Sequence, residues 1–226
     1  MLKNAIQTLK WKVAQTIEIR WWQQYLSTKT KEDYLLWKKE YWKTFLAETE
    51  IQLQPDASIL DLGCGPAGIF IIFDKQKKVT ALDPLLDYYE EKLPHFKRKD
   101  YPSVHFLAKP LEDFSPEKEG KADAVFCINA INHVKNLDYS FDILVGSVAS
   151  KGDLIVSIDV HNYSFFKYLF RYLGFDILHP HQYDLKEYET MLTDRKCTIT
   201  KRFCYKKEFF FDYYVLVVKS KRIENK

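Results

Sequence analysis

Hydrophobic positions in the first fifty residues follow a helical pattern. Residues 1–50 contain neither glycine nor proline, and they hold all five tryptophans of the chain. Helix is the regular structure that suits such a stretch. We predict two helices that are separated near residues 27–30, with Thr30 as the N-cap of the second. An aromatic stripe at helical spacing in the second helix must cover an apolar surface. The stripe consists of Tyr34, Trp37, Tyr41 and Phe45.

From residue 58 the pattern changes to short apolar runs that alternate with helical segments. Continuous apolar strands separated by helices are typical of a parallel sheet that is covered on both faces. The predicted strands are 58–62, 78–82, 104–107, 122–128 and 153–158. The predicted helices are about 66–74, 85–95, 136–149 and 185–194, the last with Asp184 as its N-cap.

The end of the chain departs from this alternation. Residues 159–183 form a long insertion rich in aromatic residues and histidine. Residues 197–205 and 210–218 then have the pattern of two strands, joined by the charged link Lys206–Glu208. A terminal hairpin with an antiparallel last strand is expected to complete the sheet.

A glycine-rich turn follows the first strand. Three of the seven glycines lie in the segment Gly63–Gly68. Glycine lets the backbone approach a ligand closely and direct its N–H groups toward it. The spacing also satisfies G-x-G-x-x-G, so a dinucleotide-binding dehydrogenase is one interpretation.

Two aspartates beside this turn separate the candidate ligands. Asp61 precedes the first glycine by two residues, and Asp83 ends the second strand. A carboxylate at Asp61 would repel a pyrophosphate, but it would attract the sulfonium and ammonium groups of S-adenosylmethionine. Asp83 can accept hydrogen bonds from both ribose hydroxyls of either ligand. The pair therefore favours the methyl donor.

Three segments carry a family resemblance, namely Ile59–Ile69, Val79–Asp83 and Asp123–Val134. Through them the chain resembles the class I S-adenosylmethionine-dependent methyltransferases over about residues 55–220. The resemblance implies an α/β fold, a three-layer Rossmann-like sandwich. Its mostly parallel seven-stranded sheet would have the order 3-2-1-4-5-7-6, with strand 7 antiparallel. Residues 1–52 would form an N-terminal helical lid, and residues 53–226 the cofactor-binding domain, with the substrate-site insertion at 159–183.

The resemblance also implies which residues bind the cofactor. The turn would pass beneath the methionine part, Asp83 would hold the ribose, and Asn129 would face the methyl group. The candidate cofactor-binding residues are Asp61, Gly63, Cys64, Gly65, Asp83, Pro84, Leu111, Glu112 and Asn129. The chain departs from the family at Lys109-Pro110, where an acidic or hydroxyl residue commonly lies near the adenine amine. Its third glycine is displaced to Gly68.

Histidines are the candidate catalytic residues. A histidine can deprotonate a hydroxyl or amine acceptor because its pKa lies near working pH. His133, His161 and His181 are the candidates, and each has a structural role as the alternative. His179 and His181, with His161 and Asp159, could instead ligate a metal, but no metal is expected.

Composition limits the classes of partner and location. The 226 residues have a net charge of +3, four cysteines without C-x-x-C spacing, and no apolar run of membrane-spanning length. We expect a cytoplasmic protein with no membrane partner. Asn129–Asn132 stands where nucleic-acid methyltransferases carry an Asn/Asp-Pro-Pro-aromatic tetrad, so we expect no nucleic-acid partner. The sequence does not indicate an oligomeric state.

The leading hypothesis is methyl transfer from S-adenosylmethionine to O or N of a small-molecule acceptor, by in-line displacement. One alternative is a non-catalytic module that binds S-adenosylmethionine and docks on a partner. The other is a nicotinamide-dependent oxidoreductase.

Overall fold

The computed structural model describes residues 2–73, 75, 78–161, 183–207 and 211–220. Its strands are β1 (Ile59–Leu62), β2 (Val79–Leu82), β3 (Val104–Leu107), β4 (Ala122–Cys127), β5 (Val148–His161), β6 (Cys197–Lys207) and β7 (Phe211–Ser220). Its α-helices are α1 (Leu2–Leu26), α2 (Lys31–Thr49), α3 (Leu86–Lys92), α4 (Pro116–Glu119), α5 (Leu137–Gly146) and α7 (Leu185–Asp194). Single 3₁₀ turns are η1 (Gly65–Ala67), η2 (Ile69–Ile72), η3 (Arg98–Asp100), η4 (Leu111–Asp113) and η5 (Ile131–His133).

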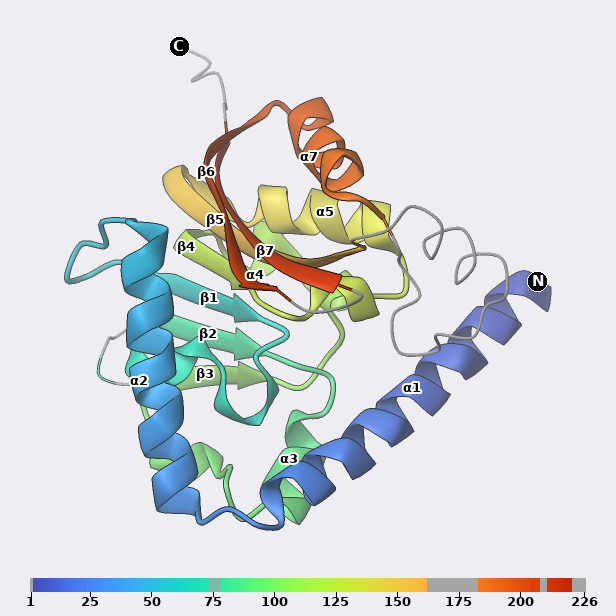
Figure 1. The fold of residues 1–226 in the computed structure, drawn as a ribbon, viewed down its shortest axis with the longest axis vertical. Helices are drawn as coiled ribbons and strands as arrows, with labels where there is room; N and C mark the ends of the chain where they lie inside the picture. Colours follow the sequence, from blue (N-terminus) through green and yellow to red (C-terminus); the bar gives the residue numbers. More distant parts are fainter. Residues whose placement is uncertain (1, 74, 76–77, 162–182, 208–210, 221–226) are drawn as a thin grey trace.

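The strands form one seven-stranded sheet in the order β3-β2-β1-β4-β5-β7-β6 (Figure 1). Strands β1 to β5 pair in parallel, and β7 pairs antiparallel with both β5 and β6. The predicted order and the antiparallel β7 are therefore confirmed. The parallel arrangement brings the C-terminal ends of β1, β2 and β4 to one edge of the sheet, where ligands bind in folds of this type.

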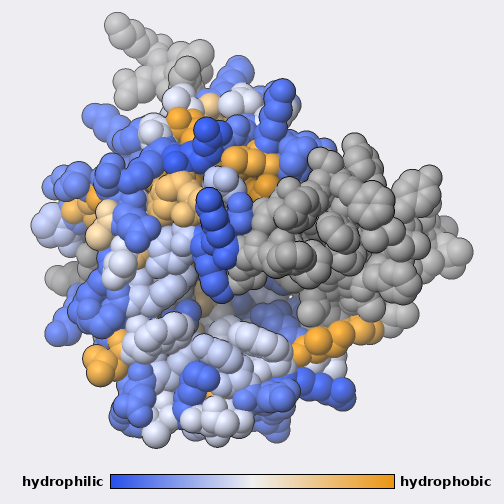
Figure 2. Space-filling view, viewed as in Figure 1, coloured by the Kyte–Doolittle hydropathy of each residue, from blue (hydrophilic) through white to orange (hydrophobic). Residues whose placement is uncertain are grey.

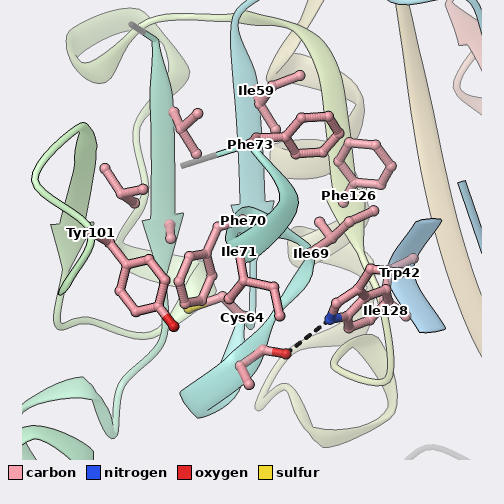
Figure 3. Packing of buried hydrophobic residues seen from close by; sticks show 14 of the residues in the cluster. Trp42, Ile59, Cys64, Ile69, Phe70, Ile71, Phe73, Tyr101, Phe126 and Ile128 are labelled. Carbon is pink, nitrogen blue, oxygen red and sulfur yellow. Dashed lines mark hydrogen bonds between the residues drawn. The ribbon is translucent and has the colours of Figure 1, made fainter. Parts of the chain in front are cut away.

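Two buried clusters lie on opposite faces of the sheet. Successive residues of a strand point to opposite faces, so Ile59 joins the cluster under α2 and α3, while Leu60 joins the one under α5 and α7. Figure 3 shows the first cluster, in which Phe126 of β4 packs beside Phe73, which follows η2. This arrangement confirms the predicted three-layer sandwich.

The two predicted N-terminal helices are present. Thr30 caps α2, because its hydroxyl accepts a hydrogen bond from the backbone N–H of Asp33 at 3.2 Å. The predicted aromatic stripe, however, is displaced around the helix. Trp37 is half exposed, whereas Trp42 is buried and its indole Nε1 donates to the carbonyl of Ala67 at 2.9 Å (Figure 3). The buried face follows Tyr34, Trp42, Phe45 and Thr49, so α2 is part of the core.

The helix predicted over 66–74 is wrong. The segment after the glycine turn instead makes the short 3₁₀ turns η1 and η2. Gly68 between them is extended, with φ −71° and ψ −176°. The β-branched residues that follow it are poor helix formers. The turn therefore enters no regular helix.

The C-terminal part differs from prediction mainly at its boundaries. Strand β5 is longer than expected and continues to His161, and Lys206 and Lys207 belong to β6. Asp184 caps α7 in a full capping box with Glu187, as predicted for the N-cap. Most of the insertion, residues 162–182, lies outside the described residues.

The surface facing the reader in Figure 2 is mostly hydrophilic, with hydrophobic side chains in separate small groups, one of them over α1. Within the described part of the chain, no helix combines the length and apolar character that a membrane crossing requires.

Candidate active site

The glycine turn connects β1 to η1 at the edge of the sheet formed by the C-terminal ends of β1, β2 and β4. The backbone N–H groups of Gly63 and Cys64 both donate to the carbonyl of Leu82, at 2.7 and 3.0 Å. Gly63 has φ +77°, and a Cβ there would lie 2.2 Å from the Cβ of Ala130. A side chain is therefore excluded at Gly63, and the turn packs directly against the end of β4.

Asp61 faces this turn from inside the protein. Its Oδ2 accepts a hydrogen bond from the backbone N–H of Phe70 at 3.1 Å. A Cβ on Gly68 would lie 2.4 Å from the same oxygen, so the close approach requires glycine. Burial raises the pKa of Asp61 to about 7, although Phe70 and the charge of Lys38 oppose the rise. The carboxylate thus occupies the start of η2.

Asp83 lies at the tip of β2 and holds the turn from the other side. Its Oδ2 accepts from the N–H of Gly65 at 3.0 Å, and its Oδ1 accepts from Leu85 at 2.8 Å. Burial raises the pKa of Asp83 to about 7, and the nearby carboxylate of Glu18 adds to the rise. Pro84 follows it and is half-buried.

The N-terminal helix α1 lies on the side of the molecule toward which β1, β2 and β3 point (Figure 1). The Cζ2 atom of Trp22 lies 3.6 Å from the place where a Cβ of Gly65 would stand. The Trp22 indole N–H and the hydroxyl of Tyr89 each lie 3.4 Å from the carboxylate of Glu18. The sequence did not predict these contacts. The spacing of Glu18 and Trp22, four residues apart in a helix, is only a weak indication that their side chains interact.

The residues predicted to border the adenine lie in η4. Leu111 is buried, and Glu112 accepts hydrogen bonds from the N–H groups of Lys135 and Asn136 at 2.6 and 3.0 Å. Glu112 therefore ties η4 to the segment that follows β4.

The segment after β4 brings the acceptor-side candidates to the same edge. Asn129 has φ +56°, and its N–H donates to the hydroxyl of Ser157 at 2.8 Å. Asn132 is buried and its amide donates to the hydroxyl of Tyr188 at 3.1 Å. Asn132 thereby fixes η5, which ends at half-buried His133.

The other candidate catalytic histidines lie outside the part of the chain whose side chains the structure describes. His161 ends β5 with only its backbone described, and His179 and His181 fall within residues 162–182. Among the residues that are described, no group of three or more His, Cys, Asp or Glu could hold a metal. The four cysteines are free, and Cys64 is buried within the turn.

The two buried aspartates make stability depend on pH. Their pKa of about 7 in the folded protein lies above the ordinary value of 3.8. Their stabilising contribution is therefore present at low pH and is lost as the pH rises through about 7. We expect the melting temperature of the ligand-free protein to fall as the pH rises from about 4 to about 7, and to level off above that. Thermal unfolding in a series of buffers measures this, and an Asp61→Asn variant with the same slope as the native protein would contradict it.

Comparison with known proteins finds a family model and relatives that match part of the chain. Residues 59–147 match the family model described as "Methyltransferase domain". A ubiquinone biosynthesis O-methyltransferase from Rickettsia bellii is 31% identical over 103 residues, which cover 45% of this chain and 42% of that protein. The matched part is thus less than half the length of that relative.

Solved structures agree over more of the chain. Magnesium protoporphyrin IX methyltransferase from Synechocystis PCC 6803, with S-adenosylhomocysteine bound, has a TM-score of 0.60 and 14% identity, and covers 95% of this chain and 99% of its own. The N-methyltransferase NodS from Bradyrhizobium japonicum, in complex with S-adenosylhomocysteine, has a TM-score of 0.58 and 14% identity, covering 88% and 91%. The fold is therefore that of class I S-adenosylmethionine-dependent methyltransferases.

Proposed function

We propose that this protein binds S-adenosylmethionine and transfers its methyl group to O or N of a small-molecule acceptor. The observation that supports the proposal is the set of hydrogen bonds that the backbone N–H groups of the glycine turn and η2 donate within the protein. Those of Gly63 and Cys64 donate to Leu82, that of Gly65 to Asp83, and that of Phe70 to Asp61.

This use of the N–H groups disfavours a phosphate ligand. A dinucleotide loop keeps backbone N–H groups directed at the pyrophosphate, at the start of a regular helix. Here a carboxylate takes that position, and the following segment makes only 3₁₀ turns. Two buried carboxylates instead favour a cationic ligand that also carries hydroxyl donors. The methyl donor has both features, whereas a nicotinamide dinucleotide would place its phosphates against Asp61.

When bound, the donor supplies an electrophilic methyl group, so the protein has to orient the reactants and exclude water. We assign the ribose to Asp83 and the ammonium group to Asp61. Leu111 and Glu112 would border the adenine, and Asn129 would face the methyl group. The helix α1, with Trp22 against Gly65, would act as the lid over the donor.

His133 is the proposed base, because it ends η5, the turn that follows β4 and Asn129, where the acceptor would approach the methyl group. His161 and His181 remain predictions. The 103-residue match to an O-methyltransferase supports an oxygen acceptor, and the fold shared with the N-methyltransferase NodS is compatible with a nitrogen acceptor.

The transfer is tested by incubating the protein with S-adenosylmethionine and a panel of phenols and amines. We expect formation of S-adenosylhomocysteine together with an acceptor heavier by one methyl group, both detected by mass spectrometry. His133→Gln should lower the rate by about 100-fold, as for loss of a general base, without changing donor affinity. Donor binding without turnover on any acceptor of the panel would favour the non-catalytic docking module.

A further inference from the structure

Tyr213 lies near the start of β7, at the edge of the sheet where the parallel strands end. Strand β7 runs antiparallel to β5 (Figure 1), so its first residues lie beside the last residues of β5, and Tyr213 is opposite Asp159. The Tyr213 side chain belongs to the buried cluster under α2 and α3. Asp61 points to the same face of the sheet, because side chains alternate along β1. Tyr213 therefore shares both the edge and the face of the glycine turn.

The hydroxyl of Tyr213 is a buried polar group that makes no hydrogen bond. The residue is 7% exposed, and its oxygen finds no hydrogen-bond partner in the part of the chain that the structure describes. Buried polar groups in proteins are nearly always hydrogen-bonded, so this hydroxyl requires an explanation. Burial also raises the pKa of Tyr213 well above its ordinary value. The hydroxyl is therefore protonated near neutral pH and can donate a hydrogen bond.

Ser157 connects this hydroxyl with the proposed position of the methyl group. The Ser157 hydroxyl accepts a hydrogen bond from the N–H of Asn129 at 2.8 Å. It also lies close enough to Tyr213 to oppose the rise in the pKa of that residue. The proposed function places Asn129 against the methyl group of the donor. Only the Ser157 side chain thus separates the Tyr213 hydroxyl from the residue beside which the acceptor would react.

Two more tyrosines give this region an aromatic character. The ring centre of Tyr205 in β6 lies 6.0 Å from that of Tyr213, and the ring centre of Tyr41 in α2 lies 5.7 Å from that of Tyr205. Tyr205 and Tyr41 are both partly exposed. Aromatic rings favour edge and stacking contacts with other rings. This neighbourhood therefore suits a flat aromatic ligand.

We propose that the hydroxyl of Tyr213 donates a hydrogen bond to an oxygen of an aromatic acceptor and so orients the acceptor for methyl transfer. The inference rests on the proposed function. The oxygen that Tyr213 binds is not the atom that attacks the methyl group, because a donated hydrogen bond would make the attacking lone pair less nucleophilic. The acceptor would therefore carry an oxygen in addition to the group that is methylated, and Tyr213 would select for it.

The test is a calorimetric titration of the full chain saturated with S-adenosylhomocysteine, so that no turnover occurs. The probes are the three isomers of methoxyphenol and the matching ethylphenols, which have nearly the same shape but lack the second oxygen. We expect at least one methoxyphenol to bind the native protein about 5- to 20-fold more tightly than its ethyl counterpart. Tyr213→Phe should lose this preference, because only the methoxyphenol loses a hydrogen bond. Its affinity for ethylphenol and S-adenosylhomocysteine should stay unchanged.

Tyr34→Phe is the matched control. Tyr34 is 2% exposed and its hydroxyl also finds no partner among the described residues, but its ring packs against Tyr25 and His95 instead. This variant should keep the preference for methoxyphenol. Thermal unfolding gives a second measurement. Since Tyr213→Phe removes an unpaired buried hydroxyl, it should melt no lower than the native protein.

Three results would overturn the role of Tyr213. They are equal binding of every methoxyphenol and its ethyl counterpart by the native protein, no binding of any phenol to the complex with S-adenosylhomocysteine, and a preference that survives in Tyr213→Phe. A clearly lower melting temperature of Tyr213→Phe would assign the hydroxyl a structural role and would also contradict the inference. Failure of the native protein to bind S-adenosylhomocysteine would instead overturn the proposed function.

Discussion

Asp83→Asn is expected to weaken binding of S-adenosylhomocysteine by about 100-fold, or about 3 kcal/mol. Asp83 is the acceptor proposed for the ribose hydroxyls, and a carboxylate accepts stronger hydrogen bonds than an amide oxygen. The amide would keep one acceptor for the N–H of Gly65 or Leu85 and would turn a donor toward the other. Calorimetric titration measures the loss.

In this variant we expect the thermal stability to be kept although the affinity is lost. Asp83 is buried near Glu18, and both effects raise its pKa, so a neutral side chain removes an unfavourable charge. We therefore expect the melting temperature of Asp83→Asn at about pH 8 to be no lower than that of the native protein. Asp87→Asn, on the exposed side of α3, is the control and should keep full affinity. Undiminished binding in Asp83→Asn would remove Asp83 from the site.

Gly63→Ala is expected to destabilise the fold by about 3 kcal/mol and to abolish donor binding. Two costs combine. Alanine is strained at φ +77°, and its Cβ would lie 2.2 Å from the Cβ of Ala130. Relief of that contact has to move the glycine turn away from the end of β4. Urea unfolding gives the stability, and titration with S-adenosylhomocysteine gives the binding.

Gly120→Ala separates these two costs. Gly120 also has a positive φ, +97°, but no atom lies within 4 Å of its would-be Cβ. Gly120→Ala should therefore lower the free energy of unfolding only by the conformational cost, about 1 kcal/mol, and should bind the donor normally. Equal destabilisation of the two variants would mean that Ala130 does not constrain the turn.

The sheet could be predicted from sequence because its signals are local. Strand β1 is entirely buried, and β3 begins and ends at the predicted residues 104 and 107. The glycine turn and Asp83 are local signals as well. The resemblance to a family supplied the strand order, which no apolar run specifies alone.

The helix expected after the turn does not form, because the segment contains residues that break a helix. Pro66 and the extended Gly68 divide the segment into two 3₁₀ turns. The buried face of α2 also differs from the predicted aromatic stripe. Several faces of that helix are aromatic, so only tertiary packing selects Trp42 over Trp37 for burial.

The contacts of α1 and α2 with the site could not be predicted, because they join residues far apart in the chain. Tyr89 approaches Glu18 across 71 positions, and no local pattern encodes that pairing.

The central claim is that the glycine turn, with Asp61 and Asp83, serves a cationic methyl donor and its product rather than a pyrophosphate. Its most direct test is a pair of calorimetric titrations of the native protein, one with S-adenosylhomocysteine and one with NADH. We predict saturable binding of one S-adenosylhomocysteine per chain and no heat of binding with NADH. Saturable binding of NADH in the absence of any affinity for S-adenosylhomocysteine would contradict the claim.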